Sequence, residues 1–95
     1  MATASPLTRK ASLAKFARLV KILDSHIQTD EPTAIIQVTS SRGFRGLRVQ
    51  GTTKQVPWSV DLYGGNFYLI KVCGLEPVTD NTPLHVVNFL RSKLP

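Results

Sequence analysis

The chain has 95 residues, 42% of them hydrophobic, and a formal net charge of +6. This length suits a single domain with one modest core, so we treat residues 1–95 as one domain and expect residues 1–5 to be flexible. No apolar run approaches the roughly 20 residues of a membrane-spanning helix. One cysteine excludes an intramolecular disulfide. These features favour a reducing, intracellular compartment such as the cytoplasm, with organellar targeting by the N-terminus left open.

The positive charge is unevenly distributed along the chain. Residues 1–54 contain nine Lys/Arg and three Asp/Glu, whereas residues 55–95 contain three of each kind. The first 54 residues therefore carry the whole excess of positive charge, +6. Such segregation favours an anionic partner, either a nucleic acid, an acidic protein surface or an anionic membrane surface.

The first predicted element is an amphipathic helix from Leu7 to about Ile27, where apolar residues recur at the helical period. Its apolar arc contains Leu13, Phe16, Leu19, Val20, Leu23 and Ile27. The opposite side carries Lys10, Lys15, Arg18 and Lys21, and no acidic residue precedes Asp24. Three interpretations fit this helix: a solvated surface helix, a phosphate-binding helix, or an organellar presequence.

Two strands and their connections are predicted next. β-Branched residues predict a strand at Ala34–Thr39, and alternation resumes at Leu47–Gln50. Ser40–Gly46, between these strands, is expected to be a flexible loop. Gly51–Gln55 is expected to be a polar connection.

A hairpin is predicted at Val56–Cys73, where two apolar-rich runs flank Gly64-Gly65, a pair suited to a two-residue turn. The expected register places Leu62 opposite Phe67, Val60 opposite Leu69, and Trp58 opposite Lys71. The predicted core face carries Trp58, Val60, Leu62, Phe67 and Leu69. The predicted solvent face carries Ser59, Asp61, Tyr63, Tyr68, Ile70 and Val72.

The chain is expected to end in a second helix. Gly74–Asn81 has the composition of a linker, Thr82 is suited to cap a helix, and Pro83 is suited to its first turn. The helix is predicted over residues 83–94. The resulting fold class is α+β, a single small domain of order α-β-β-β-β-α, with an antiparallel meander sheet covered on one face by two helices.

No pattern of residues typical of an enzyme or a metal site appears in the sequence. His26 and His85 are far apart, and Cys73 has no histidine at metal-ligand spacing. We therefore expect a protein that is not an enzyme, with no catalytic residue, no metal site and no cofactor.

The strongest functional candidate is the Arg/Gly-rich stretch from Arg42 to Arg48. Arginine offers a planar fork of donors for phosphate oxygens, the intervening glycines allow close approach, and Phe44 could stack on a base. Together with the helix cations, this predicts a nucleic-acid-binding module that reads phosphate and shape, with RNA favoured over DNA. The predicted contact residues are Lys10, Lys15, Arg18, Lys21, Arg42, Phe44, Arg45 and Arg48. One continuous basic stripe from the helix to the loop is expected.

The order of elements resembles, in topology, that of small double-stranded-RNA-binding domains. That family carries phosphate-binding lysines at the start of its last helix, where this chain has Asn81-Thr82-Pro83-Leu84-His85, so no membership is inferred. The alternative function is a protein-interaction adaptor or inhibitor that docks an acidic protein surface. It could form a homodimer through an exposed sheet face or edge, with Tyr63, Tyr68 and Ile70 as interface residues.

Overall fold

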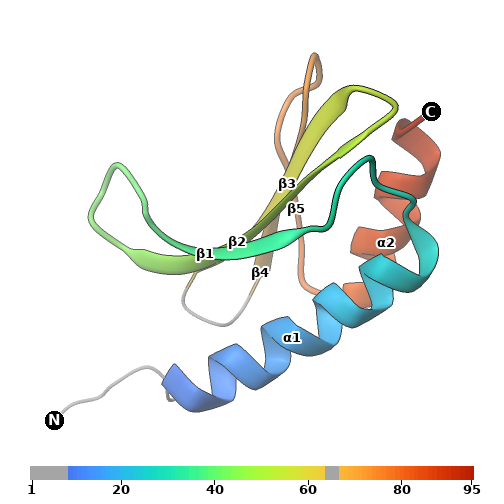
Figure 1. Ribbon diagram of the computed structural model, residues 1–95. Helices are drawn as coiled ribbons and strands as arrows, with labels where there is room; N and C mark the ends of the chain where they lie inside the picture. The colour runs from blue at the N-terminus through green and yellow to red at the C-terminus, as the bar shows by residue number, and fades with distance from the viewer. Residues whose placement is uncertain (1–8, 64–66) are drawn as a thin grey trace, which may run out of the picture.

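The computed structural model describes residues 9–63 and 67–95 (Figure 1). Its elements are α1 (Arg9–His26), β1 (Ala34–Thr39), β2 (Arg45–Thr53), β3 (Val56–Tyr63), β4 (Phe67–Val72), β5 (Val78–Asp80) and α2 (Pro83–Lys93). The start predicted for the first helix, Leu7, lies outside the described residues. The predicted strand at 34–39 is confirmed at both ends.

The five strands form one antiparallel sheet in the order β1-β2-β3-β4-β5, so each strand pairs with its neighbours in sequence. Both helices pack on the same face of this sheet (Figure 1). The predicted α+β meander with two helices on one face is thereby confirmed. The sheet has a fifth strand that was not predicted: β5 lies inside the expected linker and pairs with β4 from Tyr68–Asp80 to Ile70–Val78.

The hydrophobic core lies between the helices and the inner face of the sheet. α1 contributes Phe16, Leu19 and Leu23, Ile27 follows directly after it, and α2 contributes Val86, Val87 and Leu90. The sheet contributes Val49, Trp58, Val60, Leu62, Tyr68, Ile70 and Val72. The apolar arc predicted for the first helix is therefore confirmed, except that Leu13 is exposed, Val20 is half-buried and the buried stripe of α1 begins at Phe16.

The pairing of β3 with β4 is shifted by one residue from the predicted register. Val60 pairs with Ile70 and Tyr63 pairs with Phe67, which leaves three residues between the strands rather than two. The predicted turn residues, Gly64 and Gly65, lie outside the described residues. Because side chains alternate along a strand, a one-residue shift moves every side chain of β4 to the opposite face. The prediction that Phe67 and Leu69 belong to the core is wrong: Phe67 is 46% exposed.

β2 is longer than predicted, because it continues through the stretch expected to be a polar connection. Thr53 pairs with Val56, so Lys54 and Gln55 form a two-residue turn. Both residues have positive φ, 47° and 71°, a left-handed conformation that glycine or asparagine usually occupies. The carboxylate of Asp30 accepts hydrogen bonds from both backbone N–H groups at 2.9 Å. This contact offsets part of the cost of the turn.

Trp58 joins the sheet to the end of α1. Its ring lies so close to Gly51 that a Cβ there would sit 2.7 Å from Trp58 Cζ2, so the position requires glycine. Trp58 Nε1 donates to Thr53 Oγ1 at 3.0 Å, and Thr53 Oγ1 donates to the carbonyl oxygen of Gln28 at 2.6 Å. These two hydrogen bonds tie the segment that follows α1 to the end of β2.

Candidate functional site

The β1–β2 hairpin ends in a tight turn that carries the predicted Arg/Gly-rich residues. The N–H of Gly43 donates to the carbonyl oxygen of Ser40 at 2.9 Å, and Ser40 N–H donates to the carbonyl of Phe44 at 2.8 Å. The hydroxyl of Ser40 also accepts the N–H of Phe44 at 3.0 Å. Gly43 has φ of +90°, a conformation that closes such short loops and that glycine adopts without steric cost.

This turn displays two arginines and an aromatic ring to solvent. Arg42 and Arg45 are exposed, and Phe44 is 61% exposed, so its ring is not tucked into the core. Within residues 9–63 and 67–95, neither arginine takes part in an ion pair. No acidic residue occurs in the sequence between Glu31 and Asp61. We call Arg42, Phe44 and Arg45 the hairpin tip.

The third arginine of the motif, Arg48, lies away from the tip. It belongs to β2 and points to the outer face of the sheet, the face opposite the helices. There Arg48 Nε and Nη2 donate to the two carboxylate oxygens of Asp61 at 2.6 and 2.8 Å. This hydrogen bonding raises the pKa of Arg48 against the opposing effect of burial. Arg48 therefore lies in a strand, as the alternation at Leu47–Gln50 predicts, and not in the turn with Arg42. Asp61 holds its guanidinium away from the tip.

Asp61 is the centre of a polar cluster on the outer face. Its side chain is fully buried although it faces away from the helices. Besides the two bonds from Arg48, it accepts one from the hydroxyl of Tyr63 at 3.1 Å. The pKa of Tyr63 is raised, mainly because the hydroxyl is partly buried and secondly because the negative charge of Asp61 lies nearby. Within this cluster the carboxylate of Asp61 is neutralised by the guanidinium of Arg48. We therefore interpret the Arg48–Asp61 ion pair as a structural contact.

The helix cations divide into two groups. Arg18 and Lys21 are exposed, as predicted. Lys15 was expected to point away from the sheet, but it is half-buried and its Nζ lies 5.7 Å from the centre of the Tyr68 ring. It therefore lies on the sheet-facing side of α1. Lys10 lies in α1, but its side chain is outside the described part of the structure.

The hairpin tip and α1 have a definite relation in the fold. The chain leaves the C-terminal end of α1, enters β1, and runs back toward the N-terminal end of the helix (Figure 1). The tip therefore lies at the same end of the molecule as the start of α1. Lys21 and Arg18 lie farther along the helix. The single basic stripe expected from the sequence stays a prediction.

The alternative interface residues lie elsewhere than predicted. Tyr68 and Ile70 are fully buried beneath the helices, so the expectation that they form an exposed face is wrong. The cause is the one-residue shift of the β3–β4 register. Tyr63 is half-buried on the outer face. The outer face instead exposes Phe67 and Ile36, which the sequence analysis did not propose.

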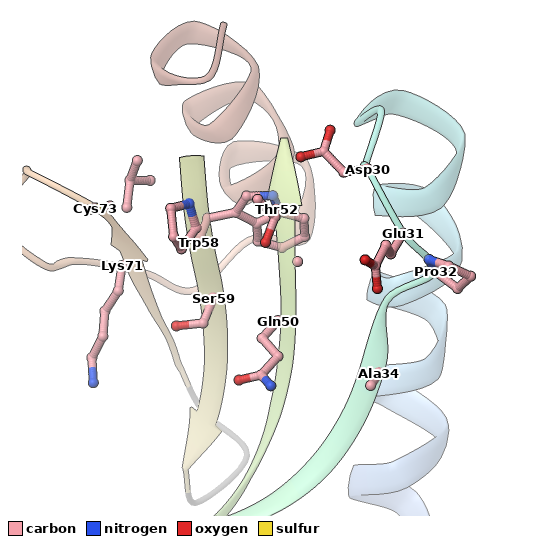
Figure 2. A pocket seen from close by; sticks show the side chains of 13 residues that line it. Asp30, Glu31, Pro32, Ala34, Gln50, Thr52, Trp58, Ser59, Lys71 and Cys73 are labelled. Atoms are coloured by element: carbon pink, nitrogen blue, oxygen red, sulfur yellow. The ribbon is translucent and has the colours of Figure 1, made fainter. Parts of the chain in front are cut away.

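A shallow groove of about 690 Å³ lies on the outer face, beside the start of β1 (Figure 2). Its rim carries charges of both signs, with Asp30 and Glu31 on one side and Lys71 on the other, and Gln50 and Ser59 form part of its floor (Figure 2). Asp30 is already engaged by the Lys54–Gln55 turn. Cys73 is exposed at its edge. Among residues 9–63 and 67–95, no three or more His, Cys, Asp or Glu side chains are grouped to hold a metal ion.

In the described residues, no helix is both long and apolar enough to cross a membrane. No protein family, curated protein or solved structure matches this chain.

Proposed function

We propose that this protein is a nucleic-acid-binding module that prefers RNA and contacts it through the hairpin tip. The observation that carries this proposal is the exposure of the Phe44 ring between Arg42 and Arg45, in a stretch of chain with no acidic residue. An apolar ring held in water between two cations has the chemistry of a site that stacks a base while arginines bind the flanking phosphates.

The hydrogen bonds within the turn support the same proposal. Three hydrogen bonds among Ser40, Gly43 and Phe44 hold the backbone of the tip. A preorganised loop loses little conformational entropy when it binds. Arg18 and Lys21, exposed on α1, would add phosphate contacts as a longer strand continues over the helix.

The proposal is tested by fluorescence-anisotropy titration of single-stranded and duplex RNA, and of the matching DNA, at two or more salt concentrations. We expect RNA to bind more tightly than DNA. Affinity should fall steeply with salt, because each phosphate neutralised by a cation releases condensed counterions. Phe44→Ala should weaken binding by roughly 1–3 kcal/mol with little change in the salt slope, because stacking is not ionic.

A matched pair of variants separates a site from bulk charge. Arg42→Glu/Arg45→Glu changes the net charge by the same amount as Arg91→Glu/Lys93→Glu, whose exposed residues end α2, far from the tip (Figure 1). The first pair should abolish binding and the second should leave most of it. Equal losses from the two pairs, or wild-type binding that does not respond to salt, would show that the tip is not the site.

A further inference from the structure

Within residues 9–63 and 67–95, the edge strand β1 has none of the usual devices that prevent strands from pairing between molecules. It is six residues long, Ala-Ile-Ile-Gln-Val-Thr, with no charge, proline or glycine. Edge strands of soluble proteins are usually short, charged, interrupted or covered. The opposite edge follows this rule, because β5 has only three residues. β1 instead presents a long, uncharged and β-branched edge.

Both faces of β1 are accessible. Ile35, on the inner face opposite Val49, is 45% exposed, and Ile36, on the outer face opposite Arg48, is 38% exposed. Every residue of β1 except Val38 is exposed. An added strand would cover these apolar side chains.

The hydrogen-bond pattern identifies which backbone groups point to the free edge. The N–H of Ser40 bonds to Phe44 on the β2 side. Hydrogen-bonded pairs alternate along an antiparallel ladder, so Val38, Ile36 and Ala34 also direct their backbone groups toward β2. The backbone groups of Ile35 and Gln37 therefore point toward the free edge.

A strand that pairs with itself about a two-fold axis must bring these odd-numbered residues together. Centring the axis on Ile36 satisfies this condition, because it pairs Ile35 with Gln37 of the second copy and Gln37 with Ile35. The outer face then forms an apolar row in which Ile36 meets Ile36, and Ala34 meets Val38. No side chain would have to change face.

The same register brings opposite charges together at both ends of the paired strands. Glu31 and Ser41 each lie five residues from Ile36, so this register brings the turn that carries Arg42 in one copy to the same end of the paired strands as Glu31 of the other. Arg42 and Glu31 are both exposed, and Glu31 lies beside the start of β1 (Figure 2). Exposed pairs contribute little affinity, but two of them favour this register over shifted ones.

We propose that β1 pairs antiparallel with β1 of a second copy of this chain, with the two-fold axis at Ile36, and that the two sheets become one continuous sheet. Backbone hydrogen bonds along the free edge and the apolar row on the outer face provide the affinity. Charge complementarity between Arg42 and Glu31 sets the register. The dimer does not depend on RNA binding. Phe44 and Arg45 lie outside the paired strands, and Arg42 is the one residue of the hairpin tip that both proposals use.

The test is sedimentation equilibrium of the full chain from about 1 to 200 μM, a range that detects micromolar association. We expect a dimer. Ile36→Lys and Ile36→Glu should each weaken association by at least about tenfold, because the axis places identical charges directly opposite one another. An equimolar mixture of the two variants should restore the dimer, because a lysine then meets a glutamate.

Ile35→Lys is the matched control. It introduces the same charge at a neighbouring, similarly exposed residue that would meet Gln37 rather than itself. It should weaken association far less than Ile36→Lys. Circular dichroism confirms that each variant is folded. A wild-type monomer throughout the range, a mixture that does not restore association, or equal effects of Ile35→Lys and Ile36→Lys would each overturn the proposal.

Discussion

The ion pair on the outer face gives a sharp prediction about stability. Arg48→Met keeps an unbranched side chain of similar length but removes both donors that hold the carboxylate of Asp61. Asp61 is fully buried, so among the described residues its carboxylate would keep one hydrogen-bond partner, the hydroxyl of Tyr63. Leaving a buried charge uncompensated typically costs about 3–5 kcal/mol.

The expected loss lies near the lower end of that range. The Arg48 side chain is 26% exposed, so water can partly replace the guanidinium. We therefore expect Arg48→Met to lower the free energy of unfolding by about 3 kcal/mol. The total free energy of unfolding of a chain of this size is roughly 5–14 kcal/mol. The variant should therefore remain folded but unfold at a much lower urea concentration.

The assay is urea denaturation followed by fluorescence of Trp58, the single tryptophan of the chain. The double variant Arg48→Met/Asp61→Leu is the control, because it removes both charges and replaces the ion pair with two apolar side chains. Its stability should return to within about 1 kcal/mol of wild type. The explanation by an unpaired buried carboxylate would be refuted if Arg48→Met lowered the free energy of unfolding by less than about 1 kcal/mol. It would also be refuted if the double variant were as unstable as the single one.

Four further predictions concern three residues. Tyr68→Phe should raise the free energy of unfolding by about 1 kcal/mol in urea denaturation, because the buried hydroxyl has no hydrogen-bond partner among the described residues. Burial raises the pKa of Tyr68 above 10.0, so the unfolded chain loses its phenolic proton first; stability should fall as pH rises above 10.0, and less so in Tyr68→Phe. Asp30→Ala should cost about 1–3 kcal/mol in the same assay, since it removes the acceptor of two backbone N–H groups, whereas Asp30→Glu offers a carboxylate and should cost less. Gln55→Gly should stabilise the chain by about 1 kcal/mol, read as a higher melting temperature, because its φ of 71° suits glycine.

The elements that the sequence predicted correctly are those with a strong period. The helical stripe from Phe16 to Ile27 has polar residues on the other side, so its orientation has one solution. On β3, Trp58, Val60 and Leu62 alternate with more polar residues, and all three are buried as predicted. At these positions the residues that the local pattern marks as apolar are the ones that the fold buries, so the prediction is correct.

The register of β4 could not be read from its own residues, because Phe67, Tyr68, Leu69 and Ile70 are apolar on both faces. A one-residue slip therefore leaves an equally hydrophobic strand. Lys71 was the available signal: the predicted register placed it beside buried Trp58, whereas the observed one places it beside Ser59. Polar residues constrain a register more strongly than apolar ones in such a strand.

The candidate site was predicted in part for a similar reason. The exposure of Arg42 and Arg45 follows from a short glycine-containing turn, which is a local property. The pairing of Arg48 with Asp61 joins residues from adjacent strands and depends on register, which no local pattern contains. The Lys54–Gln55 turn likewise depends on Asp30, far away in the chain. Long-range contacts decided each of these features.

The sequential order of the five strands has a consequence for how the protein folds. Every strand pairs with the one before it, so the sheet can grow hairpin by hairpin, with short loops to close at each step. β1 is the terminal member of this series and pairs with β2 alone within the described sheet. In the monomer, the β1 amides that bond to β2 should therefore exchange with solvent through a local opening that leaves β2, β3 and β4 intact, whereas pairing with a second copy would slow this exchange. In the monomer, the edge strand is thus the part of the sheet whose detachment least disturbs the rest of the chain.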